Sequence, residues 1–225
     1  LKKSSNPGMS RIGLSLESDA LWEMMSDFGF GSYVTDGFPG ESRGRLHHHT
    51  EWGEIGKATM SYGYGITVTP IQLAQAYSVI ANNGLYTPLS LRKGLFNESK
   101  RVINEDTAKT LLSMLEKVVE DGTSKKAAVN GYRVGGKSGT AWKTSGAGGY
   151  STDRYRSIFA GIAPIDDPRL VAVVFIEEPT GEFYYGGDVA APVFSEIISQ
   201  SLQLLSIPPQ GFITKPDLVA DNKND

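Results

Sequence analysis

Two short motifs bring together hydroxyl, amide and amine side chains, which are the groups that acyl transfer uses. Ser4-Ser5-Asn6 has the pattern Ser-x-Asn, and Lys137-Ser138-Gly139-Thr140 has the pattern Lys-[Ser/Thr]-Gly-Thr. A serine hydroxyl becomes an effective nucleophile once a neighbouring base takes its proton. Each motif alone is weak evidence, because Ser-x-Asn often arises by chance and Lys-Ser-Gly-Thr suits an ordinary strand end. Their order and wide separation favour a shared acyl-transfer site.

The composition is that of a globular protein with little net charge. Of the 225 residues, 40% are hydrophobic and 21% are charged, and the net charge is -3. Such a chain can form one domain with a sizeable core, and it has no basic excess that would indicate a nucleic-acid partner. It contains no cysteine, which excludes disulfides, thiolate metal ligands and a cysteine nucleophile. No apolar run in the sequence is long enough to span a membrane.

The elements that must position the motifs are expected to form an α+β fold. Thr69, Pro70 and Gln72 make a helix start with a capping box, and a further helix is predicted from about Glu105 to Asp121. The residues that this second helix is expected to bury are Leu111, Met114, Leu115 and Val118.

The pattern changes after residue 130 and predicts strands at 132–142, 156–163 and 170–176. Strands joined by turns indicate an antiparallel sheet covered by helices, with an all-helical part contributed by the residues before 130. A last helix should pack on the sheet through one apolar stripe, formed by Ala190, Val193, Phe194, Ile197, Ile198, Leu202 and Leu205.

Five further segments occur in the order typical of one family. They are 38–41 (Phe-Pro-Gly-Glu), 61–74, 83–88, 161–164 (Gly-Ile-Ala-Pro) and 184–187 (Tyr-Tyr-Gly-Gly). With the two motifs, they make residues 1–207 resemble the C-terminal part of the transpeptidase domain of class B penicillin-binding proteins, and most of all the septal (cell-division) enzyme of Gram-negative bacteria. The fold that this implies is that of penicillin-binding transpeptidases and serine β-lactamases, here incomplete. Residues 208–225 are expected to be a polar, loosely ordered tail.

This resemblance implies D,D-transpeptidation of peptidoglycan through a serine acyl-enzyme, with no metal or organic cofactor and with β-lactams as inhibitors. In the family's motifs, Ser4 corresponds to a hydroxyl that relays protons between the catalytic lysine and the leaving group. Asn6 corresponds to an asparagine that holds this lysine and the substrate amide by hydrogen bonds. Lys137 supplies positive charge at the site.

The same resemblance assigns substrate-binding roles. Ser138 and Thr140 offer hydroxyls to the terminal carboxylate of a D-Ala-D-Ala stem peptide or of a penicillin, and the Thr140 N–H is one donor of the oxyanion hole. Gly139 lets the ligand lie close to the strand. Tyr184 and Tyr185 are candidates for a wall of the substrate cleft, and core packing beside two glycines is the alternative interpretation.

Two departures from the family's motifs and one additional Ser-x-x-Lys match bear on the site. Ser5 replaces the Asp of Ser-Asp-Asn, which argues against a class A β-lactamase, and Ser138 stands where Thr is commoner but keeps the hydroxyl. The nucleophilic Ser-x-x-Lys is expected upstream of Ser4, so the chain alone should be inactive and should need an upstream fragment of the same protein as a partner. Ser90-Leu91-Arg92-Lys93 also matches Ser-x-x-Lys, but it lies between the other two motifs rather than before them.

Other interpretations stay open at this point. A serine β-lactamase or β-lactam sensor would share the fold and differ in its rate of deacylation, and a non-catalytic scaffold for division proteins would belong to another class. His47-His48-His49 suggests a metal site, but adjacent side chains of an extended segment point to opposite sides, which favours a polar loop. From the resemblance alone, the protein is expected at the periplasmic face of the inner membrane, with division-complex proteins as partners and its anchor outside this chain.

Overall fold

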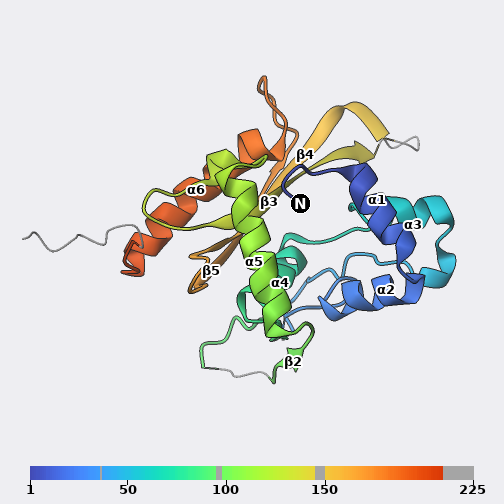
Figure 1. Ribbon diagram of the computed structural model, residues 1–225, viewed down its shortest axis with the longest axis horizontal. Coiled ribbons are helices and arrows are strands. Elements are labelled where there is room, and N and C mark those ends of the chain that lie inside the picture. Colours follow the sequence, from blue (N-terminus) through green and yellow to red (C-terminus); the bar gives the residue numbers. More distant parts are fainter. Residues whose placement is uncertain (36, 95–97, 145–149, 210–225) are drawn as a thin grey trace, which may run out of the picture.

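The computed structural model describes residues 1–209 except 36, 95–97 and 145–149. The expected tail therefore lies almost entirely outside the described residues. Along the described chain, most helices precede the main sheet and the last helix follows it (Figure 1). The helices are α1 (Asn6–Ser15), α2 (Ser18–Asp27), α3 (Glu54–Met60), α4 (Pro70–Ala81), α5 (Glu105–Glu120) and α6 (Gly186–Leu204), with two short 3-10 helices, η1 (His49–Glu51) and η2 (Lys125–Ala127).

The main sheet is antiparallel and has three strands in the order β3-β4-β5, as the sequence predicts. β3 spans Gly135–Thr144, β4 spans Tyr150–Ala163 and β5 spans Leu170–Glu177. β4 begins six residues before the expected position 156, because the hairpin with β3 continues to the pair Thr144 and Tyr150. β3, which carries the Lys-Ser-Gly-Thr motif, is an edge strand, so one side of its backbone is not paired within the described sheet.

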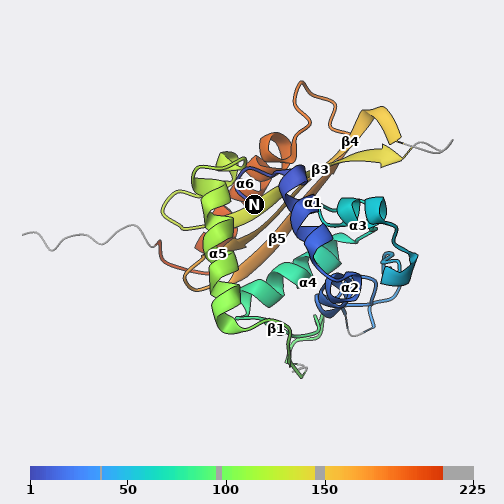
Figure 2. The same ribbon diagram turned by 45° about the vertical axis from the view of Figure 1, so that its right-hand side comes forward.

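Helices cover both faces of this sheet, and each face has its own core. Figures 1 and 2 show α6 on one side of the sheet and α4 and α5 on the other. Side chains alternate between the faces of a strand; accordingly, Phe159 joins the core with α6, whereas Ile162 joins the core with α5. The α6 core includes Phe159, Ala163, Val174, Ala190, Phe194, Ile198 and Leu202, and the α5 core is made of Leu112, Leu115, Ile162 and Ile165.

The predicted starts of α4 and α5 are confirmed, and the predicted buried faces of α5 and α6 are confirmed only in part. α4 begins with the predicted capping box of Thr69 and Gln72. In α5, Leu115 and Val118 are buried as expected, but Met114 is exposed. In α6, Val193, Ile197 and Leu205 of the predicted stripe are exposed. The buried apolar face of α6 is formed by Ala190, Ala191, Phe194, Ile198 and Leu202, so the predicted stripe was too wide.

The part before residue 130 is not purely helical, which corrects that expectation. A two-stranded antiparallel ribbon pairs β1 (Leu85–Tyr86) with β2 (Lys100–Arg101). In both ribbon views, this ribbon lies at the end of α5 that is remote from the N-terminus of the chain (Figures 1 and 2). Among the described residues, no helix is both long enough and apolar enough to cross a bilayer.

Candidate active site

The edge strand β3 presents its motif to both faces of the sheet. Near the start of the strand, a Cβ at Gly135 would lie 2.9 Å from the backbone nitrogen of Glu116, so α5 packs directly on that face. Because side chains alternate, Lys137 shares this face, whereas Ser138 and Thr140 belong to the opposite one. A ligand lying along the open edge of β3 can therefore be reached from both sides at once.

Gly139 has room around it. A Cβ at this position would meet nothing closer than the Ile158 Cβ, at 3.9 Å. Packing inside the described protein therefore does not require glycine here. A glycine that internal packing does not require suits a place where a ligand lies close to the backbone.

Lys137 is a partly buried cation without a carboxylate partner among the described residues. Its Nζ donates a hydrogen bond to the backbone oxygen of Ser138 at 2.5 Å. Burial lowers the pKa of this ammonium group below the usual value for lysine, because desolvation disfavours the charged form. Such a group can gain an anionic partner without giving up an existing ion pair.

The hydroxyls of Ser138 and Thr140 are held by elements far away in the sequence. Ser124, in the turn after α5, donates its hydroxyl to Ser138 Oγ at 3.1 Å. The backbone N–H of Gly186, the first residue of α6, donates to Thr140 Oγ1 at 3.0 Å. Since both motif hydroxyls act as acceptors in these contacts, each can still donate its own proton to a ligand's carboxylate.

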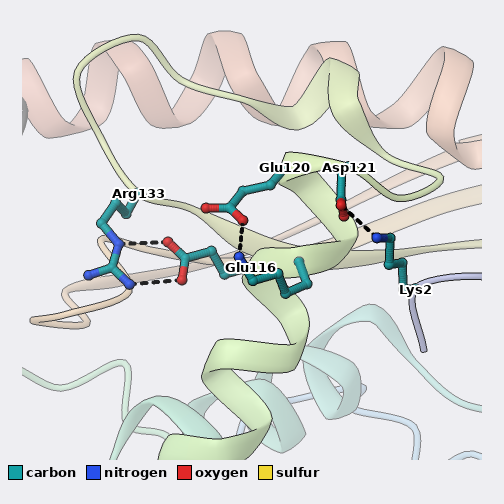
Figure 3. A network of polar contacts seen from close by, with 6 residues as sticks. Lys2, Glu116, Glu120, Asp121 and Arg133 are labelled. Carbon is teal, nitrogen blue, oxygen red and sulfur yellow. Dashed lines mark hydrogen bonds and ion pairs between the residues drawn. The ribbon is translucent and has the colours of Figure 1, made fainter.

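Ser4 and Asn6 lie in the N-terminal segment, which both ribbon views place alongside β3 (Figures 1 and 2). Lys2 contacts Asp121 at 2.5 Å and ties this segment to the end of α5, as Figure 3 shows. Ser5 caps α1 by accepting a hydrogen bond from the Gly8 N–H, so Asn6 is the first helical residue. Both Ser4 and Asn6 are exposed, and within the described residues no hydrogen bond joins either of them to Lys137.

The backbone at Ser4 is unusual. Its φ of 50° lies in the left-handed region, which residues other than glycine seldom adopt. Such conformations concentrate at functional sites, where the surrounding structure holds them in place. The end of α1 is fixed as well, because a Cβ at Gly13 would collide with the side chain of Ser61, which follows α3.

Tyr184 and Tyr185 belong to a row of aromatic rings at the start of α6. Tyr155 stacks on Tyr184 with ring centroids 4.0 Å apart, and the Tyr184 and Tyr185 centroids are 4.4 Å apart. Trp142 extends the row from β3, 4.8 Å from Tyr155. Tyr185 is more than half exposed. Neither Tyr155 nor Ser124 was predicted from the sequence. Tyr155 joins the row because it pairs with Trp142 across the hairpin, and this pairing is the signal that could have identified it.

Comparisons with known proteins identify the family of the chain. The family model described as the penicillin-binding protein transpeptidase domain matches residues 1–199. The chain belongs to this family. The chain is 45% identical over 226 residues to a probable peptidoglycan D,D-transpeptidase, PbpC, of Pseudomonas aeruginosa. It is 40% identical over 216 residues to the peptidoglycan D,D-transpeptidase FtsI of Escherichia coli.

Solved structures show the same relationship. The transpeptidase domain of penicillin-binding protein 3 from Burkholderia pseudomallei superposes with a TM-score of 0.86 at 43% identity, over 92% of this chain and 64% of that one. The match to PbpC covers 100% of this chain but only 40% of PbpC. The match to FtsI covers 95% of this chain but only 37% of FtsI. The 225 residues thus span well under half the length of these curated relatives.

Ser90, the serine of the additional Ser-x-x-Lys match, does not lie with the transpeptidase motifs. Ser90 follows β1 in the connection to β2, where its hydroxyl contacts the backbone of Arg92. That ribbon is at the far end of α5 from the N-terminal segment (Figure 2). Lys93 is exposed. The structure thus keeps Ser90 away from the strand that carries Lys137.

Two of the three histidines, His48 and His49, pack with each other and with an aromatic neighbour. The rings of His48 and His49 are 4.3 Å apart, and Trp22 lies 4.9 Å from His48. His47 Nδ1 is 3.0 Å from a carboxylate oxygen of Glu51. In the described part of the chain, no three His, Asp or Glu side chains are grouped so that they could hold a metal ion.

An ion pair between a buried carboxylate and a half-exposed arginine joins the chain just before β3 to α5. Arg133 donates from Nε and Nη2 to the two carboxylate oxygens of Glu116, at 2.6 and 2.8 Å (Figure 3). The Glu116 side chain is only 7% exposed, whereas that of Arg133 is 55% exposed. This fork-shaped contact sets the register of α5 against the strand that carries Lys137.

We expect Glu116→Gln to lower the free energy of unfolding by about 2 kcal/mol, since the buried carboxylate and one charge-assisted hydrogen bond are lost. Chemical denaturation followed by circular dichroism measures this. Glu120→Gln, which removes the exposed partner of Lys117 on the same helix, is the matched control and should change stability little. Equal losses in the two variants would contradict a special role for Glu116.

Proposed function

We propose that this chain forms the C-terminal part of a serine D,D-transpeptidase that cross-links peptidoglycan stem peptides at the division septum and is acylated by β-lactams. The observation that carries the proposal is the open edge of β3, with a partly buried lysine on one face and two hydroxyl groups on the other. Membership of the transpeptidase family and the names of the relatives support it.

The terminal carboxylate of the stem peptide accounts for the residues of β3. Lys137 has no carboxylate partner among the described residues and attracts an anion. Ser138 and Thr140 donate hydrogen bonds to it, and Gly139 leaves space for the ligand's backbone. An extended ligand can also pair with the free edge of β3, because an edge strand exposes unpaired N–H and C=O groups.

The reaction divides into two acyl transfers. A serine of a Ser-x-x-Lys segment outside these 225 residues attacks the carbonyl carbon of the penultimate D-alanine. The peptide C–N bond breaks, and the terminal D-alanine leaves with a proton. The amino group of a second stem peptide then attacks the ester, forms the new amide and releases the serine, which regains a proton.

Residues of this chain support both steps. Ser4 passes the proton between the catalytic lysine and the leaving amine, and Asn6 holds this lysine and the substrate amide. The Thr140 N–H stabilises the oxyanion, a contribution typically of several kcal/mol. The left-handed backbone of Ser4 supports a functional role for this segment.

We further propose that the protein acts at the periplasmic face of the inner membrane, with division-complex proteins as partners. The setting at the septum rests on the resemblance to septal enzymes, and FtsI is among the relatives. Tyr184 and Tyr185 wall the substrate cleft next to Thr140. The exposed ring of Tyr185 and its place as the N-cap of α6 support this.

Intact-mass spectrometry with benzylpenicillin tests the function. The full-length protein should gain one penicillin mass that persists, while the 225-residue chain incubated alone should gain none. Ser90→Ala in the full-length protein serves as the control and should be acylated as the wild type is. An adduct on the isolated chain would place the nucleophile within it and overturn the site, and a full-length protein that gains no adduct would overturn the function.

A further inference from the structure

Ser124 is a buried hydroxyl that contacts the proposed carboxylate site without belonging to either motif. It lies between α5 and η2 and is fully buried. Its hydroxyl donates to Ser138 Oγ at 3.1 Å. A buried polar group that points at a binding hydroxyl can control where that hydroxyl directs its own proton.

The turn that carries Ser124 is held from several sides. The Ser124 N–H donates to the Val118 oxygen at 3.3 Å, and the Ser124 oxygen accepts from the Ala127 N–H at 3.0 Å. Beside it, a Cβ at Gly122 would lie 2.6 Å from the Val118 oxygen, so the turn packs tightly on α5. The Ser124 hydroxyl therefore approaches Ser138 from a fixed direction.

We propose that Ser124 is a positioning residue: by donating to Ser138, it directs the Ser138 proton toward a ligand carboxylate on the open edge of β3. A serine oxygen has one proton and two acceptor lone pairs. When one lone pair is engaged by Ser124, the proton of Ser138 must point elsewhere, and the ligand side offers a strong anionic acceptor. This inference rests on the proposed carboxylate-binding role of Ser138.

Removing the Ser124 hydroxyl should weaken recognition of a carboxylate more than it slows acyl transfer. For Ser124→Ala in the full-length protein, we expect the dissociation constant of the initial benzylpenicillin complex to rise about three- to tenfold, as for loss of one hydrogen bond. The first-order acylation rate should stay within about twofold. Stopped-flow measurement of acylation against inhibitor concentration separates the two constants.

A substrate without the carboxylate charge distinguishes positioning from a general structural defect. With the methyl ester of benzylpenicillin, Ser124→Ala should behave as the wild type does. The double variant Ser124→Ala/Ser138→Ala should be no weaker toward benzylpenicillin than Ser138→Ala alone, since coupled residues are not additive. Ser195→Ala is the matched control, because it removes a hydroxyl of α6 that donates to the Ala128 oxygen at 2.6 Å and makes no hydrogen bond to Ser138 among the described residues.

The outcomes separate this inference from the proposed function. Equal losses with benzylpenicillin and its ester, or additive effects of the two serine substitutions, overturn the role of Ser124 and leave the transpeptidase function standing. A wild-type protein that no β-lactam acylates overturns both. If Ser124→Ala does not fold, Ser124→Cys keeps the volume and replaces the hydroxyl with a weaker donor, so it should give the same charge-dependent loss to a smaller extent.

Discussion

Replacing Lys137 with alanine should lower the second-order rate constant for acylation of the full-length protein by benzylpenicillin by about a hundredfold. The substitution removes the partly buried cation beside the proposed carboxylate and oxyanion sites, where an electrostatic group is typically worth that much. Lys137 has no ion pair among the described residues, so its loss leaves no unpaired carboxylate that would confuse the measurement. Intact-mass time courses at several inhibitor concentrations give the rate constant.

The matched control lies on the same strand. Lys143→Ala removes a lysine whose ammonium group already pairs with Glu177 and Glu178. It should leave the acylation rate within about threefold of the wild type, because a lysine that is already paired contributes little to binding a distant anion. Similar losses for the two lysines would contradict a specific role for Lys137.

The lowered pKa of Lys137 gives this prediction a pH signature. Burial favours the neutral amine, so the cation is lost at a lower pH than for an exposed lysine. Benzylpenicillin binding should therefore weaken as the pH rises through this lowered pKa and should be fully retained below it. In Lys137→Arg, the guanidinium stays charged over this range, and the alkaline loss should disappear.

Replacing Gly186 with alanine should both destabilise the domain and damage the site. A Cβ at Gly186 would overlap the backbone oxygens of Ile158 and Gly139, which are not flexible side-chain ends and cannot easily move aside. We expect the free energy of unfolding to fall by about 3 kcal/mol, as for a severe overpacking. The start of α6 must then shift, and the hydrogen bond from the Gly186 N–H to Thr140 is lost.

The control for this prediction comes from the preceding loop. A Cβ at Gly181 would meet nothing within 4 Å, so Gly181→Ala should be close to neutral. Thermal and urea denaturation compare the two variants, and acylation by benzylpenicillin reports the effect on Thr140. If Gly186→Ala is no less stable than Gly181→Ala, the close approach of α6 to β3 and β4 is not what holds this end of the site.

The sequence was most informative where local rules decide the structure. The capping box of Thr69 and Gln72 places the start of α4 because both hydrogen bonds are made within one turn. The apolar run 170–176 lies in the strand β5 because its residues suit a half-buried pleated surface. The order of the two motifs and of the five further segments was enough to indicate the family.

What the sequence did not provide depends on pairing between distant segments. β4 extends over polar residues because the hairpin with β3, not hydrophobicity, continues the ladder. The exposed side of α6 could not be separated from its buried side until the sheet beneath it was known. The contact of Ser124 with Ser138 forms because the turn after α5 reaches the middle of β3, and no local sequence pattern predicts this contact.

The attachment of Ser138 and Thr140 to distant parts of the chain means that Lys-Ser-Gly-Thr is not a portable tetrapeptide. The motif depends on the 121–124 turn on one side and on the first residue of α6 on the other. Grafted onto an edge strand of another scaffold, the same four residues would keep their chemistry but lose the orientation of both hydroxyls. The unit that a designer would have to transplant is a strand, a turn and a helix start together.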